Sequence, residues 1–219
     1  MISSASRDIP SVMGDAAVIT GDLIGSRKAG PQATELAMLE IADAAKAASA
    51  AFERYRGDGW QVLLLQPERA LRYSLLVTAR LRSIRAPLSR FAVGIDAVPQ
   101  ERAQSLAAET GGAFVTSGKV LDEMPRRSVF AIASMTRTLN EMTWAAAQLA
   151  DQVARKWTPQ QAEAMIFALS PTNPSGASIA KSLGISPAAT SYRLHGANWW
   201  AIKAVVSAFE RELGESLDA

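Results

Sequence analysis

Up to about residue 133, short apolar runs alternate along the chain with longer stretches of mixed polarity. The short runs are typical of buried strands, and the longer stretches are typical of helices. Strands are expected over 16–20, on either side of a turn within 53–65, over 91–95 and over 129–133. Helices are expected over 33–52, 67–84 and about 111–124, with a shorter one near 100–109.

The order of these elements indicates the fold class. The first four strands and their helices form a βαββαβ pattern, which predicts a ferredoxin-like antiparallel sheet with helices on one face. The predicted class is therefore α+β. In the helix over 67–84, the aliphatic residues are expected to face inward. Its arginines are expected to face solvent: Arg69, Arg72, Arg80 and Arg82.

After residue 134 the pattern is wholly helical. A long helix is expected over 135–157, and Thr158 with Pro159 are start signals for the next helix. After a break at 171–176, two short helices meet at Gly184-Ile185-Ser186, which is the pattern of a helix-turn-helix. Ala180 is expected to pack where these two helices cross, and a last helix starts at about Trp199.

These patterns predict four segments. They are a flexible N-terminus over 1–14, a sheet domain over 15–134, a connecting helix over 135–157 and a helix-turn-helix domain over 158–219.

Composition narrows the possible chemistry. The 219 residues are 48 % hydrophobic, which is enough for one core or a core plus a small module, and the net charge of +2 gives no strong field. There is no cysteine and one histidine, His195, which excludes disulfides, a thiol nucleophile and a multi-histidine metal site. No signal peptide and no apolar run of membrane-spanning length is apparent, so a soluble cytoplasmic protein is expected.

Two aspartates are the main candidates for chemistry. Asp58 is expected at the tip of a hairpin turn, Gly57-Asp58-Gly59, and Asp22 at the end of the first strand. In a sheet of this order the two carboxylates can lie side by side, where they repel each other unless a cation lies between them. The alternative is that Asp58 only caps its turn.

Other polar residues near these turns have two readings each. Arg27 and Lys28 either contact phosphate or are solvated loop charges. Arg54 either contacts a nucleotide or forms a cross-strand charge pair. Asp96, at the end of the strand over 91–95, is interpreted as a plain turn residue, with a functional role as the alternative.

The stretches Val-Ile-Thr-Gly-Asp22-Leu-Ile-Gly-Ser and Arg54-x-x-Gly-Asp58-Gly-Trp-Gln resemble the two metal-aspartate motifs of class III nucleotidyl cyclases and GGDEF palm domains. This resemblance covers roughly 16–133, and the whole chain resembles the SatD family. It implies that Asp22 and Asp58 bind one or two Mg²⁺ and that Arg54 stands where cyclases carry a base-reading lysine. It also implies that phosphate is held by the backbone amides after Asp22: Leu23, Ile24, Gly25, Ser26 and Arg27.

The sequence departs from the cyclases in one respect. They carry an Asn and an Arg, one turn apart on a helix, that support the transition state. The segment 114–123 has no such pair, and Lys119 cannot make the bidentate phosphate contacts of an arginine. Nucleotide binding is therefore expected more than turnover.

The helix-turn-helix predicts a surface for double-stranded DNA; the alternative is that the same geometry serves only for packing. The segment from Ser178 to Lys203 contains basic residues and no acid, and because the cations are few a homodimer is expected. His195 is interpreted as a surface or groove residue, and Trp199 and Trp200 as anchors of the last helix. The expected DNA contacts are Lys181, Thr190, Ser191, Tyr192, Arg193 and Lys203.

Three functions remain open from the sequence. The first is a DNA-binding transcriptional regulator whose cyclase-like domain binds a nucleotide, Mg²⁺ or both as a sensor. The second is an active enzyme that makes a cyclic or linear nucleotide from a nucleoside triphosphate. The third is a dimerising scaffold in which both sites have decayed.

Overall fold

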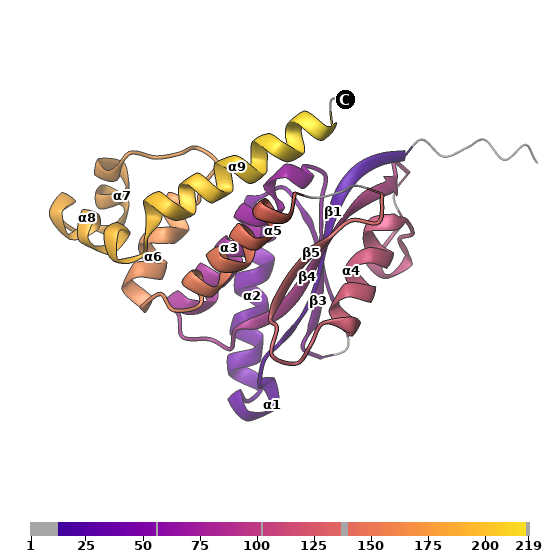
Figure 1. The fold of residues 1–219 in the computed structure, drawn as a ribbon. Helices are drawn as coiled ribbons and strands as arrows, with labels where there is room; N and C mark the ends of the chain where they lie inside the picture. Colours follow the sequence, from indigo (N-terminus) through magenta and orange to yellow (C-terminus); the bar gives the residue numbers. More distant parts are fainter. Residues whose placement is uncertain (1–12, 56, 102, 137–139, 218–219) are drawn as a thin grey trace, which may run out of the picture.

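A computed structural model describes residues 13–55, 57–101, 103–136 and 140–217. It has a mixed α+β fold, in which helices cover a five-stranded sheet (Figure 1). The strands are β1 (Met13–Leu23), β2 (Ala51–Tyr55), β3 (Gly59–Leu64), β4 (Ser89–Pro99) and β5 (Phe130–Ala133). Their order across the sheet is β2-β3-β1-β4-β5, with every neighbouring pair antiparallel except β4 and β5, which are parallel.

The helices follow the predicted order with shifted boundaries, except that α1 was not predicted and the short helix expected near 100–109 is only a 3-10 turn. Those of the sheet region are α1 (Ser26–Ala29), α2 (Pro31–Ala47), α3 (Ala70–Ser83) and α4 (Gly112–Glu123), with short 3-10 turns at Pro67–Arg69 and Leu106–Ala108. Those that follow are α5 (Glu141–Ala154), α6 (Pro159–Ala168), α7 (Gly176–Leu183), α8 (Pro187–Gly196) and α9 (Trp199–Leu217). No helix within the described residues combines the length and the apolar composition that a membrane span requires.

Helices cover both faces of the sheet: α2 and α3, the helices of the βαββαβ pattern, lie on one face as expected, and α4, which follows that pattern, covers the other. Along β1, Ala17 and Ile19 join the core formed with α2 and α3, whereas Ala16 and Val18 pack with Ala113 of α4. Because successive side chains of a strand point to opposite faces, a strand that is apolar at every position is buried on both sides. Figure 1 shows α4 on the side of the sheet opposite α2 and α3.

Strand β4 is longer than predicted and passes through Asp96, so Asp96 is not a turn residue. Its carboxylate is fully buried and accepts hydrogen bonds from Thr116 on α4, from Ser134, and from the backbone and side chain of Thr136. The backbone N–H of Met135 also donates to it, at 3.1 Å. These bonds hold 134–136 in a non-helical loop, which is why α5 begins at Glu141 rather than at 135.

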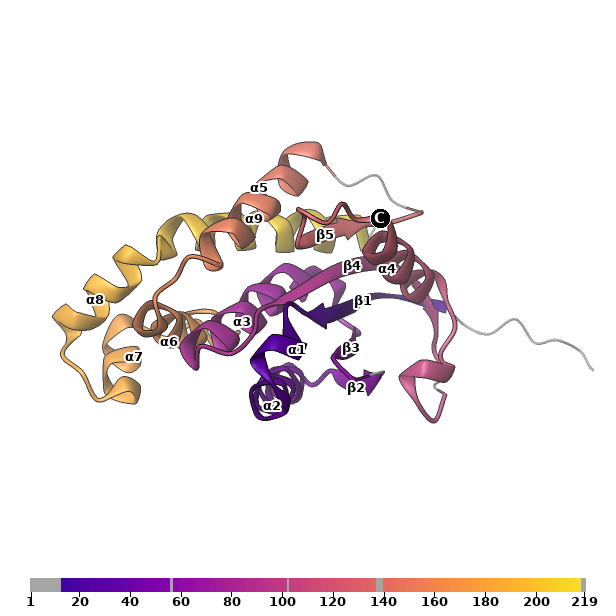
Figure 2. The ribbon, with the colours of Figure 1, turned by 90° about the horizontal axis from the view of Figure 1, so that it is seen from below.

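The C-terminal helices pack on α3, so the prediction that its arginines face solvent is wrong for most of them. Arg72 forms two hydrogen bonds with Glu210 of α9, at 2.6 and 2.9 Å, and Arg80 pairs with Glu40 of α2 at 3.0 Å. Arg82 donates to the backbone carbonyl of Trp157. One continuous core cluster runs from the sheet to α9, and α5 and α9 lie beside β5 in Figure 2.

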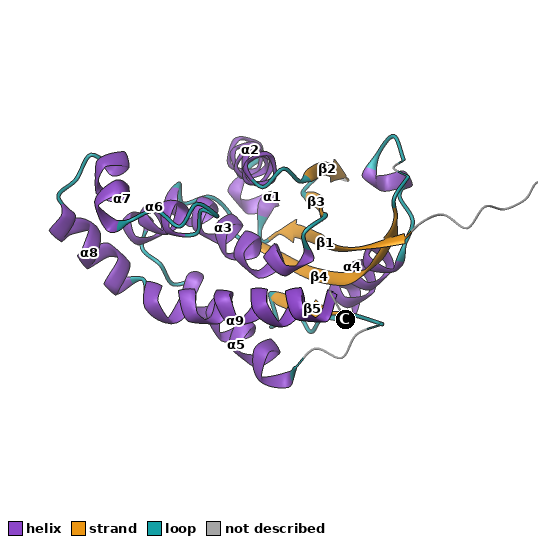
Figure 3. Cartoon of the chain, turned by 90° about the horizontal axis from the view of Figure 1, so that it is seen from above, coloured by secondary structure: helices purple, strands orange, loops and turns teal. Residues whose placement is uncertain are grey.

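The helix starts at the C-terminal end agree with their sequence signals. Thr158 and Gln161 form a capping box at the start of α6, and Ser186 caps α8. Gly184 ends α7 in the left-handed region, at φ 65°, and Ala180 is buried as expected. Figure 3 shows α7 and α8 at the end of the molecule away from the sheet.

The two adjacent tryptophans of α9 behave differently. Trp199 is buried, as predicted, but Trp200 is 68 % exposed, because neighbouring helix positions face in different directions. The predicted flexible N-terminus lies largely outside the described residues, and Met13 and Gly14 already belong to β1.

Candidate functional site

The structure brings Asp22 and Asp58 together at one end of the sheet. In the antiparallel register Asp22 lies opposite Gly59 of β3 and opposite Arg90 of β4. The N–H of Leu23 donates to the backbone carbonyl of Asp58 at 3.1 Å, which fixes the hairpin tip against the end of β1. The geometry therefore supplies the neighbouring carboxylates that the two motifs predict.

The carboxylate of Asp22 lies in an unfavourable environment for its charge. Burial raises the pKa of Asp22 above its ordinary value of 3.8, Arg90 opposes this rise, and the negative charge of Asp58 adds to it. Its Oδ1 atom is buried and has no hydrogen-bond partner in the described part of the chain. A buried carboxylate oxygen without a partner is costly, and a cation would satisfy it.

Asp58 is held by the segment that follows β1. The hydroxyl of Ser26, at the start of α1, donates to Oδ2 of Asp58. No group of three or more His, Cys, Asp or Glu side chains suited to a metal occurs among the described residues. Two carboxylates suit Mg²⁺, which usually keeps several waters and is bound through one or two carboxylates plus phosphates of a substrate. The donor set therefore fits a magnesium ion that arrives with a nucleotide.

An open groove with a volume of about 590 Å³ adjoins Asp58. Its polar lining comes from α1, α2 and the hairpin: Ser26, Arg27, Thr34, Glu35, Arg54 and Asp58. Arg54 pairs with Glu35 of α2 at 2.6 Å and donates to the carbonyl of Gly57, so the predicted cross-strand pair is replaced by a pair between strand and helix. Both partners are substantially exposed, and such a pair contributes only about 0–1 kcal/mol, so Arg54 can exchange Glu35 for an anionic ligand at small cost.

Two of the amides predicted to hold phosphate are already used. The N–H of Leu23 donates to Asp58 and that of Ile24 donates to Leu88, because the chain is still in sheet-like pairing at these positions. Gly25 then turns the chain in the left-handed region, at φ 70°. The amides of Gly25, Ser26 and Arg27 stand at the start of α1, where a helix offers no acceptor for them. Of the backbone amides predicted to hold phosphate, these three therefore remain candidates. The side chain of Lys28 is exposed and lies outside the groove lining.

Residues that the sequence did not single out complete the site. Ser89 accepts a hydrogen bond from Nε1 of Trp60 and donates to the backbone carbonyl of Asp22, at 2.8 and 2.7 Å. Arg90 faces Asp22, and its guanidinium donates to the carbonyl of Leu121 at the end of α4. The strand was expected to begin at 91, one residue after Arg90, so neither residue was in the predicted register.

The glycine before Asp22 is required by packing. A Cβ atom at Gly21 would lie 2.7 Å from the side chains of both Phe91 and Trp60. Only glycine lets these two aromatic rings, 5.7 Å apart between centroids, close beneath the site.

Helix α4 supplies no substitute for the Asn and Arg of the cyclases. It contains neither residue type, and Lys119 is exposed. Its buried polar groups are hydroxyls, those of Thr116 and Ser117, and Ser117 shares a hydrogen bond of 2.8 Å with Thr20 of β1.

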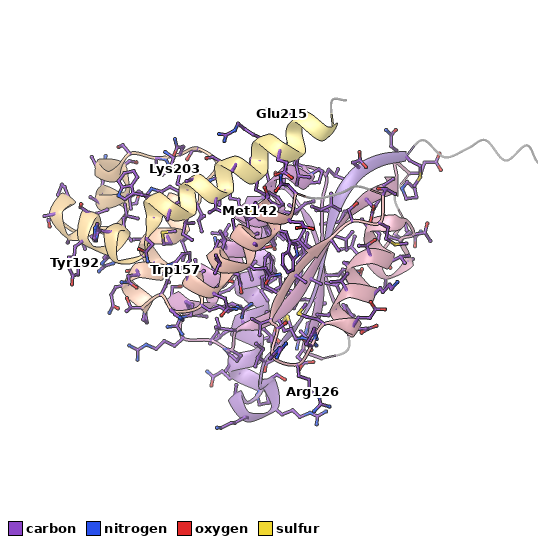
Figure 4. All side chains as sticks on the ribbon, viewed as in Figure 1. Arg126, Met142, Trp157, Tyr192, Lys203 and Glu215 are labelled. Carbon is purple, nitrogen blue, oxygen red and sulfur yellow. The ribbon has the colours of Figure 1, made fainter. Side chains whose placement is uncertain are left out.

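Helices α7 and α8, the segment predicted as a helix-turn-helix, present only part of the predicted DNA surface. Lys181, Ser191 and Tyr192 are exposed, and Figure 4 shows Tyr192 projecting from the end of the molecule. Thr190 is not available, because its side chain is buried and its hydroxyl donates to the carbonyl of Ser186. Arg193 points toward α6, where it pairs with Glu163 at 2.6 Å.

Two further predicted residues lie beside these helices. Lys203, on α9, is half-buried. His195 is exposed on α8, as expected for a surface residue.

Comparisons with known proteins identify no family. No protein-family description matches the sequence, and no curated protein matches it. Among solved structures, a guanylyl cyclase, Cya2, aligns with a TM-score of 0.42 and 14 % sequence identity, over 51 % of this chain and 71 % of the other.

Proposed function

We propose that this protein binds a magnesium–nucleotide complex at the Asp22–Asp58 edge and acts as a regulator that responds to it. The observation that carries the proposal is the buried Oδ1 of Asp22, which has no hydrogen-bond partner among the described residues and belongs to a carboxylate that interacts with that of Asp58. A cation between the two carboxylates would remove both the repulsion and the unsatisfied oxygen.

The surroundings of the two carboxylates favour a phosphate-bearing ligand. Arg27 and Arg54 line the groove beside Asp58, and Ser26, at the start of α1, belongs to the same lining. Anions are stabilised by backbone amides at a helix start and by arginines, and phosphates also complete the coordination of Mg²⁺. The antiparallel order β2-β3-β1-β4 supports the ferredoxin-like, cyclase-like reading of this region.

We favour binding over turnover. Charge that develops on transferred phosphate needs preorganised donors, and these often supply the largest catalytic term. α4 offers neither Asn nor Arg, and Arg90 is engaged with carbonyls of Leu121 and Met124. A nucleotidyl cyclase or nucleotidyltransferase remains the alternative function.

The test is calorimetric titration of the full chain with ATP and GTP, with and without Mg²⁺. Asp58→Asn removes one carboxylate charge and is expected to weaken Mg²⁺-dependent nucleotide binding at least tenfold, or about 1.4 kcal/mol. Asp43→Asn, which changes an exposed carboxylate of α2 outside the groove, is the matched control and should bind as wild type does. Equal nucleotide affinity in wild type and Asp58→Asn would refute the proposal.

Chromatography of the same mixtures separates the two functions. A regulator returns the nucleoside triphosphate unchanged. Steady release of pyrophosphate, lost in Asp22→Ala, would establish the enzyme instead.

A second function, DNA binding by α7 and α8, is favoured by one observation. No acidic residue occurs between Glu163 and Glu210, so the exposed ends of both helices carry only neutral and basic side chains. A surface without carboxylates suits a phosphate backbone.

A further inference from the structure

A second cavity lies between α2, α3 and α6, at the end of β3 opposite Asp58. Its volume is about 240 Å³. Its walls are mainly apolar: Ala48, Leu64, Leu76, Ile166, Phe167 and Leu169. Small-molecule pockets are typically about 300–1,000 Å³, so this one suits a ligand below drug size.

Three arginines line the cavity, and two of them are committed to the fold. Arg72 forms its two close bonds to Glu210, and Arg80 pairs with Glu40 at 3.0 Å. Arg69 is different. Its recorded contact with a carboxylate, from Nε to Glu68, is 4.0 Å long, beyond hydrogen-bond distance, and its side chain is 45 % exposed. With respect to the described residues, Arg69 therefore brings a cation with unused hydrogen-bond donors to the lining of an apolar cavity.

No carboxylate belongs to the described lining of this cavity. The charges of Arg72 and Arg80 are balanced by Glu210 and Glu40, which lie outside the lining, so a cationic ligand would meet the uncompensated charge of Arg69. A fully apolar ligand would leave Arg69 unused. The charge distribution thus favours an anion, and the apolar walls favour a ligand that is mostly hydrocarbon.

We propose that this cavity binds a small organic monoanion with an aliphatic body, such as a medium-chain carboxylate. The hydrocarbon occupies the space between Leu76 and Ile166, and the carboxylate lies at Arg69. The site is separate from the Asp22–Asp58 edge, because it lies at the other ends of α2 and β3. A test of this proposal therefore does not depend on whether the protein binds a nucleotide.

The first experiment titrates the full chain calorimetrically with octanoate, octan-1-ol and octylammonium, which share one chain length and differ in charge. Octanoate is expected to saturate one site and to bind at least threefold more tightly than octan-1-ol, with octylammonium weakest. Arg69→Gln should reduce octanoate to the affinity of octan-1-ol. Lys46→Gln, which removes an exposed cation of α2 outside the cavity, should leave octanoate binding unchanged. Equal binding of octanoate and octan-1-ol, or tighter binding of octylammonium, would overturn the proposal.

The second experiment locates the ligand in the wild-type protein, so it does not depend on any variant folding. Methyl NMR should show saturable octanoate-induced shifts at Leu64, Leu76 and Ile166. Ala48→Phe fills the cavity and should weaken binding at least tenfold, whereas Ala42→Phe, at a half-buried position of α2 outside the cavity, should not. Shifts confined to other methyl groups, or no saturation below about 1 mM, would overturn the assignment.

Discussion

At the scale of single residues, the ionised carboxylate of Asp22 destabilises the metal-free fold. Its pKa is raised in the folded state by burial, and further by Asp58, despite Arg90. A carboxyl group whose pKa is higher in the folded state binds more protons when the protein is folded. Ionisation of this group therefore lowers the free energy of unfolding as the pH rises from the unfolded-state pKa to the folded-state pKa. Asp22→Asn removes that effect, so with EDTA present the variant should be at least as stable as wild type at neutral pH.

Urea unfolding at a series of pH values checks this. The difference between Asp22→Asn and wild type should shrink as the pH falls toward 3.8, the ordinary pKa of the carboxyl. A metal-free wild type that is clearly more stable than Asp22→Asn at neutral pH would contradict it.

Asp96 behaves in the opposite way. Burial alone would raise its pKa, but hydrogen bonds from Thr116, Thr136, Met135 and Ser134 outweigh burial and lower the pKa below 3.8. The ionised carboxylate of Asp96 therefore stabilises the fold fully at any pH above its unfolded-state pKa. This stabilisation is lost as the pH falls through its folded-state pKa.

Replacing Asp96 should be costly. Asp96→Asn cannot accept from all of these donors and should lower the free energy of unfolding by about 2–4 kcal/mol at neutral pH. The gap to wild type should narrow in acid. Asp122→Asn, on the exposed side of α4, should change stability by no more than about 0.5 kcal/mol. Equal stability of Asp96→Asn and wild type in thermal unfolding at neutral pH would refute the role of this carboxylate.

At the scale of elements, substitutions at two glycines distinguish the effect of close packing on stability from the effect of helix propensity. A Cβ at Gly94 of β4 would lie 2.5 Å from the carbonyl oxygen of Ala113 and 2.6 Å from the amide of Ser117. Gly94→Ala should therefore push α4 off the sheet and cost about 2–4 kcal/mol. Gly118, within α4, has open space, and Gly118→Ala should stabilise by about 0.5–1 kcal/mol through helix propensity. Chemical denaturation of both variants checks the pair, and similar effects would contradict the close packing.

For α7 and α8, which we propose as a DNA-binding pair, the structure changes which residues are expected to touch DNA. Arg193 is occupied by Glu163, so Arg193→Ala should change DNA affinity little. Lys181→Ala should lower the salt slope of binding by about 1, as expected for one lost phosphate contact. Fluorescence anisotropy with a duplex from the protein's own promoter region, over a salt series, measures both. A larger loss from Arg193→Ala than from Lys181→Ala would reverse this assignment.

The sequence predicted which helices and strands form better than it predicted which of their faces are buried. The order of elements along the chain, the α+β class and the helix start at Thr158 could be predicted because they depend on local pattern and capping chemistry. The covering of α3 by α6 and α9 could not, because an arginine with a distant acidic partner looks the same in sequence as one in water. The wrong prediction that Thr190 is available to DNA has the same origin. The helix that contains Thr190 was predicted, but the face that it turns toward α6 was not.

The candidate site shows the same limit. The neighbouring positions of Asp22 and Asp58 follow from the turns and the strand order. Arg90 and Ser89 were missed because a boundary error of two residues hides a cross-strand partner. The amides of Leu23 and Ile24 could be excluded only once their partners were known.

At the scale of the whole molecule, the predicted division into a sheet domain and a helix-turn-helix domain can be tested. Two separate domains would unfold in two steps. The core cluster instead runs without interruption from Ile19 of β1 to Phe209 of α9. The pair between Arg72 and Glu210 and the bond from Arg82 to Trp157 join the same two regions. We therefore expect one cooperative transition, with a calorimetric enthalpy equal to the van't Hoff enthalpy.

Glu210→Gln sharpens this test. It removes the charge partner of a half-buried Arg72 and should cost about 1–3 kcal/mol, which for a chain of this size lowers the midpoint by roughly 2–4 °C per kcal/mol. If the two regions unfold together, the whole transition shifts and remains single. Scanning calorimetry of wild type and variant decides the matter. Two resolved transitions in wild type, or a shift confined to one of them in Glu210→Gln, would show that the regions are independent domains.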